Sequence, residues 1–198
     1  MTRSVCAVVL AAGEGSRFQA VAGQGRSKLL AHCTGRDGSR RSVLEHVLIN
    51  LQGVADRIVL VTRPDLPQIA ELAQRYDCQL VSLASAGMGD SIACAVAAAP
   101  DYDAWLIVLG DMPFILPQTL QGVAALTRCD SISVPVFGSE SGHPVGFGRQ
   151  YGCALQALSG DQGARRLFKD GRVQRLEVDD PGVLWDVDVP DRLVFAPR

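Results

Sequence analysis

The chain has 198 residues, of which 47% are hydrophobic and 20% are charged, and its formal net charge is −2. This length favours one well-packed α/β domain over two, so we expect a single domain over residues 1–198. The 19 Lys and Arg residues are balanced by 21 Asp and Glu residues. Because a duplex-binding protein normally carries a basic surplus or a basic stripe, the composition argues against a nucleic-acid partner.

The six cysteines are spread along the chain, without a CxxC pair and without the Cys/His spacing of a zinc site. Several lie within apolar runs, where cysteine behaves as a small hydrophobic residue. The apolar run at 5–12 is too short for a signal peptide, and no segment approaches the length of a membrane span. We therefore expect a reduced, cytoplasmic protein without a membrane partner.

The first half of the chain alternates apolar strand-like runs with helical periodicity. Residues 5–10 form a continuous apolar run, as in a strand that is buried on both faces of a parallel sheet. Ser42 and Glu45 form a capping box that opens a helix, and Asp65 is expected to cap another. The predicted segments are a strand at 5–10, a long loop at 13–28, a helix from 42 to 53, a strand at 57–61, a helix at 65–76 and a strand at 79–81.

The second half begins with a glycine loop and becomes richer in strands toward its end. Residues 105–109 are a long apolar strand that ends abruptly in Gly110-Asp111, and Pro117 suits the first turn of the next helix. The last third is expected either to extend the sheet or to form a lid. The predicted segments are a glycine loop at 87–91, a helix at 92–99, strands at 105–109, 132–136 and 143–147, a short helix at 161–168 and a half-exposed strand at 173–178.

Strands alternate with helices through the first two-thirds of the chain, which indicates βαβ units and a doubly wound sheet. In such sheets, ligands bind beyond the carboxyl ends of the strands. Three distinctive segments are expected at that edge: the loop after Leu10, the glycine loop before Ile92 and the turn after Leu109. Their coincidence at one edge is more informative than any of them alone.

The loop after the first strand reads LAAGEGSRF over residues 10–18. Small residues let backbone N–H groups approach a polyphosphate closely, and Arg17 and Lys28 can neutralise phosphate charge. The Gly-x-Gly-x-x-Phe spacing from Gly13 lacks the third glycine of a dinucleotide-binding loop, and no Walker sequence is present. A flexible turn with two glycines is the alternative interpretation of this loop alone.

Asp111 stands at the end of a strand that is predicted to be buried. An unpaired buried carboxylate is costly, so we interpret Asp111 as a Mg²⁺ ligand, with a helix cap as the alternative. Mg²⁺ usually takes one or two protein carboxylates, and Asp186 and Asp188 would share one face of a strand. An acidic surface turn is the alternative for this pair. Surface charge is expected at Asp179, Asp180 and Asp191.

Polar side chains also occur at three other glycine-rich turns. Ser91 could offer its hydroxyl to a base or ribose, or be a polar residue at a helix N-terminus. His143, in Ser-Gly-His-Pro, is assigned to substrate contact, although a lone histidine is more often a structural hydrogen-bond partner and no triad spacing is present. The segment 160–166 is similar to a phosphate-binding helix start, with a plain capped helix as the alternative.

Taken in order, these segments resemble the molybdenum cofactor nucleotidyltransferase family, within the wider glycosyltransferase-A-like nucleotidyltransferases. The match runs from about Val5 to Leu193. LAAG together with GHP is most similar to the cytidylyltransferase branch, because the guanylyltransferase branch usually has a second glycine where Ala12 stands. The matching motifs are LAAGEGSRF, SKLL, SVLEHVL, GMGDSI, VLGDMP, GHPVGF, GDQGARRL and WDVDVPDRL.

The resemblance implies a three-layer α/β/α, Rossmann-like nucleotidyltransferase fold with a mostly parallel mixed sheet. It also implies Mg²⁺ as cofactor, CTP as the favoured nucleoside triphosphate and molybdopterin, with molybdenum, as the acceptor. Relatives of this branch occur as accessory proteins beside molybdenum hydroxylases, so a molybdoenzyme partner is a further expectation.

By position, the resemblance assigns a role to each matching residue. The catalytic residues would be Lys28, Arg17 and Asp111. The metal would be bound by Asp111 together with Asp186 or Asp188, and the acceptor side would be lined by His143 and Pro144. The nucleotide would be held by Leu10, Ala11, Ala12, Gly13, Gly15, Arg17 and Lys28, with Gly87 and Ser91 against its base or ribose.

The chain departs from the family pattern at two insertions, which leave other functions open. Phe18-Gln19 stand where the family usually has Met-Gly, residues 20–27 delay Lys28, and a second insertion lies near 35–41. A sugar phosphate or another phosphorylated metabolite is an alternative acceptor. The displaced lysine favours a second alternative, a catalytically silent nucleotide- or cofactor-binding chaperone for molybdoenzyme assembly. An oxidoreductase is the weakest alternative, because the dinucleotide fingerprint is incomplete.

Overall fold

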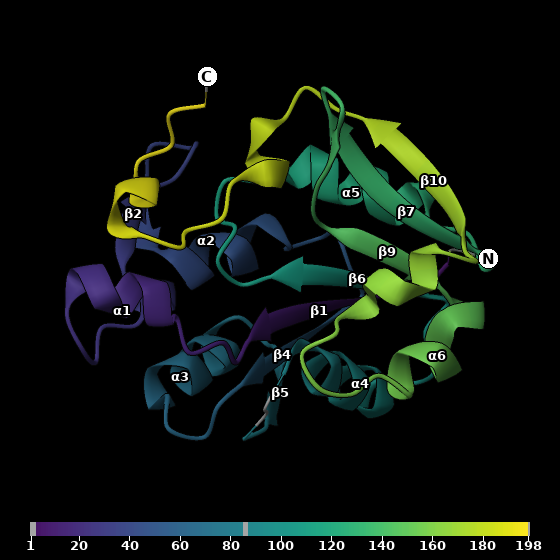
Figure 1. Ribbon diagram of the computed structural model, residues 1–198, viewed down its shortest axis with the longest axis horizontal. Helices are drawn as coiled ribbons and strands as arrows, with labels where there is room; N and C mark the ends of the chain where they lie inside the picture. Colours follow the sequence, from purple (N-terminus) through teal and green to yellow (C-terminus); the bar gives the residue numbers. More distant parts are fainter. Residues whose placement is uncertain (1–2, 85–86, 198) are drawn as a thin grey trace.

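The structure, a computed structural model, describes residues 3–84 and 87–197 (Figure 1). An eight-stranded sheet runs through the centre, and a two-stranded hairpin is separate from it. The large sheet contains β1 (Val5–Ala11), β4 (Arg57–Thr62), β5 (Gln79–Ser82), β6 (Ala104–Leu109), β7 (Ser131–Phe137), β8 (Glu140–Ser141), β9 (Val145–Gly148) and β10 (Arg172–Glu177). The hairpin consists of β2 (His32–Thr34) and β3 (Arg40–Ser42).

Helices cover both faces of the large sheet. The α-helices are α1 (Ser16–Ala22), α2 (Val43–Asn50), α3 (Pro67–Arg75), α4 (Met88–Ala98), α5 (Pro117–Leu126) and α6 (Gly152–Gln156). Short 3₁₀ helices are found at Lys28–Leu30, Arg149–Tyr151, Ala164–Phe168, Pro181–Leu184 and Pro190–Leu193.

The strand order β10-β7-β9-β6-β1-β4-β5 makes the sheet mixed and mostly parallel. Strands β6, β1, β4 and β5 are parallel, β9 is antiparallel to both its neighbours, and β10 is again parallel to β7. The chain leaves β1 toward β4 and β5 and then returns to β6 on the other side of β1. The sheet therefore has its topological switch point between β1 and β6, where doubly wound folds bind ligands.

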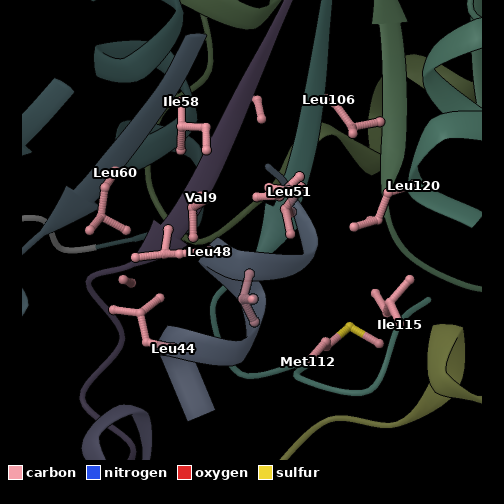
Figure 2. Close-up of a cluster of buried hydrophobic side chains, with 14 of the residues drawn as sticks. Val9, Leu44, Leu48, Leu51, Ile58, Leu60, Leu106, Met112, Ile115 and Leu120 are labelled. Carbon is pink, nitrogen blue, oxygen red and sulfur yellow. The ribbon is translucent and has the colours of Figure 1, made fainter. Parts of the chain in front are cut away.

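Successive residues of β1 enter two different cores, because side chains of a strand alternate between faces. Val9 packs with Leu48 of α2 and Leu120 of α5 in one cluster (Figure 2). Val8 packs with Ile92 of α4 in the other. One layer of helices thus lies on each side of the sheet, which confirms the three-layer α/β/α, Rossmann-like prediction.

A third, smaller core joins the N-terminal part of the chain to its C-terminal segment, which lies beside α1 and β2 in Figure 1. Phe18 of α1 and Cys33 of β2 are buried in it with Val187. Phe114, which follows β6, stacks on Phe195 with ring centroids 4.8 Å apart. This core holds together the segments that carry Arg17, Lys28 and Asp188.

The predicted loop at 13–28 is wrong in part, because residues 16–22 form helix α1. The helix is anchored by Phe18, which is only 3% exposed. Gly15, with φ 65°, occupies the left-handed conformation that favours glycine and starts the helix without a side-chain cap. The first insertion, residues 20–27, therefore continues this helix and forms its return turn. The single buried apolar side chain of the helix, Phe18, was too weak a signal to predict it.

The other boundaries differ by a few residues. The capping box is confirmed, since the Ser42 hydroxyl accepts a hydrogen bond from the Glu45 backbone N–H at 3.3 Å. Asp65 does not cap α3, because the helix begins at Pro67 after Leu66. Helix α4 begins at Met88 instead of residue 92. The strand predicted at 143–147 occupies 145–148, and the helix predicted at 161–168 is a 3₁₀ helix at 164–168.

The C-terminal third extends the sheet, because β10 pairs with β7 over its whole length. The expectation of surface charge at Asp180 is wrong. Its side chain is 2% exposed and accepts hydrogen bonds from the Thr119 hydroxyl at 2.7 Å and the Leu116 backbone N–H at 2.9 Å. Arg36, at the tip of the β2–β3 hairpin, forms an ion pair with the same carboxylate and lies over the Phe195 ring at 5.1 Å. The second insertion therefore supplies the counter-charge of a buried acid.

Within residues 3–84 and 87–197, no helix combines the length and the apolar character that crossing a membrane requires.

Candidate active site

A cleft of about 490 Å³ opens at the carboxyl ends of β1 and β6, at the topological switch point. Three segments that the sequence placed at one edge all contribute to it: the loop after β1, the start of α4 and the turn after β6. Among the described residues, it is lined by Leu10, Ala11, Ala12, Gly13, Glu14, Gly15, Lys28, Leu29, Gly87, Met88, Ser91, Leu109, Asp111 and Asp161.

Lys28 lies in the cleft in spite of the insertion that precedes it. After α1, turns at Gly23 and Gly25, both with positive φ, bring the chain back to the loop after β1. A Cβ on Gly15 would lie 3.5 Å from Lys28 Cγ, so the lysine stem packs directly under the glycine loop. The extra residues are therefore absorbed by α1 and its return turn, and the lysine faces the cleft.

Lys28 stands between two carboxylates at this end of the cleft. Its Nζ is 2.6 Å from Asp111 Oδ2 and 2.8 Å from Asp188 Oδ1. Burial alone would lower the pKa of Lys28, but the charges and hydrogen bonds of Asp111 and Asp188 outweigh it and raise that pKa. Arg17 adds a second cation, with NH1 2.8 Å from Asp188 Oδ2 and a side chain that is 80% exposed.

A third carboxylate, Asp186, lies close enough to be influenced by the other two. Burial raises its pKa, and the charges of Asp188 and Asp111 add to the shift, while Arg192 at 3.7 Å opposes them. By contrast, the hydrogen bond from Lys28 lowers the pKa of Asp188. The backbone N–H of Val187 donates to the Asp111 carbonyl at 2.9 Å and fastens the two acidic segments together. Asp186 and Asp188 were expected to share one face of a strand, but residues 186–188 do not form a strand in the structure.

The carboxylates fit a magnesium ion. Asp111 Oδ1 is buried and has no hydrogen-bond partner among the described residues, which leaves one ligand atom available beside the cleft. No group of three or more His, Cys, Asp and Glu side chains suited to a metal occurs in the part of the chain that the structure describes. A site that relies on one or two carboxylates and completes its shell with phosphate oxygens and water is typical of Mg²⁺.

The opposite end of the cleft is built around the N-terminus of α4. The Ser91 hydroxyl donates to the Gly87 carbonyl at 3.2 Å, so its proton is used within the helix. A Cβ on Gly87 would lie 2.5 Å from the backbone nitrogen of Asp161. Gly87 and Ser91 line the cleft as expected, but the absence of a side chain at Gly87 also makes room for the loop around Gly160.

His143 and Pro144 are not among the residues that line the cleft. The His143 backbone N–H donates to the Val183 carbonyl at 3.0 Å, and its Nδ1 is shielded from solvent without a partner among the described residues. Burial lowers the pKa of His143, against the opposing charge of Asp111. The histidine thus lies within the electrostatic influence of Asp111, on the β9 side, and its contact with an acceptor stays a prediction.

The segment 160–166 was interpreted as similar to a phosphate-binding helix start, and phosphate binding there stays a prediction. The segment becomes helical only at Ala164, as a short 3₁₀ helix, and its Gly160 turn packs against α4. Five cleft-lining residues were missed: Glu14, Leu29, Met88, Leu109 and Asp161. Asp161 follows Gly160, whose turn (φ 64°) packs on α4 and brings the aspartate to the cleft, a contact that the sequence did not indicate.

The fold and the cleft at its switch point define a nucleotide-binding protein of the Rossmann-like α/β class. The chain belongs to the family of the MobA-like NTP transferase domain, whose model matches residues 7–177. The resemblance recognised in the motifs is thereby confirmed at the level of this family.

Individual relatives agree with this assignment. Bifunctional protein GlmU of Azorhizobium caulinodans is 34% identical over 169 residues, which cover 82% of this chain and 36% of the relative. The chain thus spans about a third of the length of that protein. Purine catabolism protein PucB of Bacillus subtilis is 30% identical over 130 residues, 63% of each protein. The crystal structure of Rv0371c from Mycobacterium tuberculosis has a TM-score of 0.80 at 26% identity, covering 96% of this chain and 95% of that one. Rv0371c is also known as a complex with manganese.

Proposed function

We propose that the chain is a Mg²⁺-dependent nucleotidyltransferase that moves CMP from CTP to a molybdopterin-type phosphorylated acceptor and releases pyrophosphate. A single domain, residues 1–198, would carry the whole reaction. The observation that carries this proposal is the position of Lys28, within 2.6 Å of Asp111 and 2.8 Å of Asp188 at the mouth of a glycine-lined cleft. A cation and carboxylates beside a glycine loop are the groups that a triphosphate and its metal require.

In the proposed reaction, a phosphate oxygen of the acceptor attacks the α-phosphorus of the triphosphate in line. The new P–O bond forms as the bond from the α-phosphorus to the bridging oxygen breaks, and pyrophosphate leaves with that electron pair. A terminal phosphate is largely deprotonated near neutral pH, so the attack needs no strong general base. This agrees with a cleft whose described lining includes no histidine.

The chain contributes mainly positioning and charge. The loop from Gly13 to Gly15 would offer backbone N–H groups to the phosphates, and Lys28 and Arg17 would neutralise charge that develops on the leaving pyrophosphate. Asp111 with Asp188 or Asp186 would hold Mg²⁺, which when bound neutralises phosphate charge and orients the transferred group. The manganese complex of Rv0371c supports a divalent metal in a protein of this fold.

Lys28 would change partners when the nucleotide binds. In the structure its ammonium is shared by Asp111 and Asp188. A bound triphosphate would offer it phosphate oxygens, and a divalent ion would then take over the carboxylates. The lysine is thus suited to keep these two acidic side chains together until metal and nucleotide arrive.

The preference for CTP and for molybdopterin rests on the motifs LAAG and GHP, and a molybdoenzyme partner rests on the same resemblance. A cytoplasmic location fits the reduced cysteines, which include the buried Cys6 and Cys33. The alternative of a silent chaperone was favoured by the displaced Lys28, and the return of this lysine to the cleft removes that argument.

The test is pyrophosphate release from CTP, GTP, ATP and UTP, each with Mg²⁺ and with molybdopterin supplied as acceptor. We expect release only when CTP and the acceptor are both present. Release with a sugar phosphate in place of molybdopterin would overturn the acceptor and keep the reaction class. Tight nucleotide binding without release for any acceptor would overturn the transfer reaction and support the chaperone alternative.

A further inference from the structure

Asp161 lines the cleft from a loop that the proposed reaction has not used, residues 159–162. Two hydrogen bonds fasten it to the first turn of α4. The Gly89 backbone N–H donates to the Gly160 carbonyl at 2.8 Å, and the Gly160 N–H donates to Asp90 Oδ1 at 3.2 Å. A Cβ on Gly89 would lie 2.8 Å from the Ser159 carbonyl oxygen. The loop is therefore held closely against the helix, and the position of Asp161 follows from it.

Asp161 brings a negative charge into this end of the cleft. Within the described part of the chain it makes no hydrogen bond and no ion pair. A carboxylate in a nucleotide cleft repels phosphate groups, whereas Lys28 at the other end attracts them. At the Lys28 end the carboxylates Asp111 and Asp188 are balanced by Lys28 and Arg17, whereas Asp161 has no such cation among the described residues. A bound nucleotide is therefore placed with its triphosphate at Lys28 and its nucleoside at Asp161.

Met88 gives the same end an apolar surface. Its side chain is exposed and lines the cleft, and a Cβ on Gly163 would lie 2.8 Å from its sulfur, so the thioether is packed against the loop. A thioether makes favourable contacts with an aromatic ring. A base lying on Met88 would direct its polar edge to the nearby groups of the loop.

We infer that Asp161 is a specificity-determining residue that accepts a hydrogen bond from the exocyclic amino group of the base. An ionised carboxylate is an acceptor only. It therefore matches the 4-amino group of cytosine and opposes the 4-oxo group of uracil. Ser91 cannot supply the missing donor to uracil, because its hydroxyl proton goes to the Gly87 carbonyl. The inference rests on the proposed function, since it requires a nucleotide in this cleft.

The experiment compares Asp161→Asn with the wild-type chain, using calorimetric titration of CTP and UTP in the presence of Mg²⁺. Asparagine keeps the shape of the side chain and adds an N–H donor. We expect wild-type protein to bind CTP on the order of tenfold more tightly than UTP, and the substitution to abolish or reverse this ratio. Asp161 is exposed, so thermal unfolding should be unchanged.

Two matched variants isolate the effect. Among the described residues, Glu14 is the other cleft-lining acid whose carboxylate has no partner, and Glu14→Gln removes its charge. Asp170→Asn removes an exposed acid of the same C-terminal region outside the cleft. Both should keep the wild-type ratio of UTP to CTP dissociation constants. A titration with 2′-deoxy-CTP distinguishes recognition of the base from recognition of the ribose.

The outcomes are distinct. A ratio that Asp161→Asn leaves unchanged overturns the inference while the proposed function stands. The inference is also overturned if Asp161→Asn weakens CTP and UTP binding equally and does not weaken binding of 2′-deoxy-CTP. That result would assign Asp161 to the ribose. Failure of the wild-type chain to bind any of these nucleotides overturns the proposed function itself.

Discussion

The two ends of the cleft are held in place by different forces. At the Lys28 end, side chains from distant parts of the chain are joined by ion pairs of 2.6 and 2.8 Å. At the α4 end, backbone packs on backbone, and glycines are needed because a side chain would have no room. Glycine therefore has a different role at each end. Gly13 borders open space, whereas the Gly160 turn occupies the space that a side chain at position 87 would need.

The largest effect is expected at the charged end. Asp111→Asn keeps the size of the side chain but removes the ionised ligand atom and one partner of Lys28. We expect kcat to fall on the order of a hundredfold or more, with near-ultraviolet circular dichroism unchanged. Asp179→Asn is the control, because Asp179 is exposed and does not line the cleft. Near-normal turnover in folded Asp111→Asn protein would contradict the metal assignment.

A substitution at the α4 end of the cleft is expected to change the stability of the fold. Gly87→Ala places a Cβ 2.5 Å from the Asp161 backbone nitrogen, and hydrogen bonds between Gly160 and the first turn of α4 hold the two segments together. We expect the free energy of unfolding to fall by about 1–3 kcal/mol, as for other overpacked sites. Urea denaturation measures it, and an unchanged midpoint would show that the loop can move away from α4 at little cost.

Gly13→Ala is the matched change at the charged end. A Cβ on Gly13 meets no atom within 4 Å, and its φ lies outside the left-handed range. The free energy of unfolding should therefore change by less than about 0.5 kcal/mol. Affinity for CTP with Mg²⁺ should fall about tenfold, because the methyl group enters the space where phosphates would approach the backbone. Unchanged affinity would contradict the assignment of the glycine loop to phosphate binding.

The smallest effect concerns the pH dependence of stability. Because Lys28 lowers the folded-state pKa of Asp188, this carboxylate stabilises the fold above its ordinary pKa, and the contribution is lost as the pH falls through the lowered value. The difference in unfolding free energy between wild type and Asp188→Asn should be constant above about pH 5 and shrink below about pH 4. It should stay below about 1 kcal/mol, because the pair is partly exposed and Asp186 repels it. A difference that grows toward low pH would contradict the ion pair.

The sequence was sufficient for the features that depend on periodicity and on strand ends. The apolar runs at 5–10 and 105–109 correspond to β1 and β6, and the three segments expected at one edge of the sheet do meet in one cleft. Strand ends predict a site because parallel strands bring their carboxyl ends to the same edge. The direction of β9, antiparallel between β6 and β7, had no comparable signal.

The features that the sequence did not predict have a common cause, because each depends on tertiary contacts. Helix α1 depends on one buried side chain, Phe18, and the burial of Asp180 depends on Arg36, which lies 144 residues away in the chain. Asp161 enters the cleft only because the Gly160 turn packs on α4. None of these partners is local, so propensity and spacing could not reveal them.

The ion pair between Arg36 and Asp180 also bears on how this domain can change in evolution. A surface insertion is usually free to shrink or disappear, but the β2–β3 hairpin carries the cation that balances a buried acid. Deleting the hairpin alone would leave that charge unbalanced, at a cost of about 3–5 kcal/mol. A lineage can lose the insertion only if position 180 becomes neutral first, so the two features are expected to be inherited together.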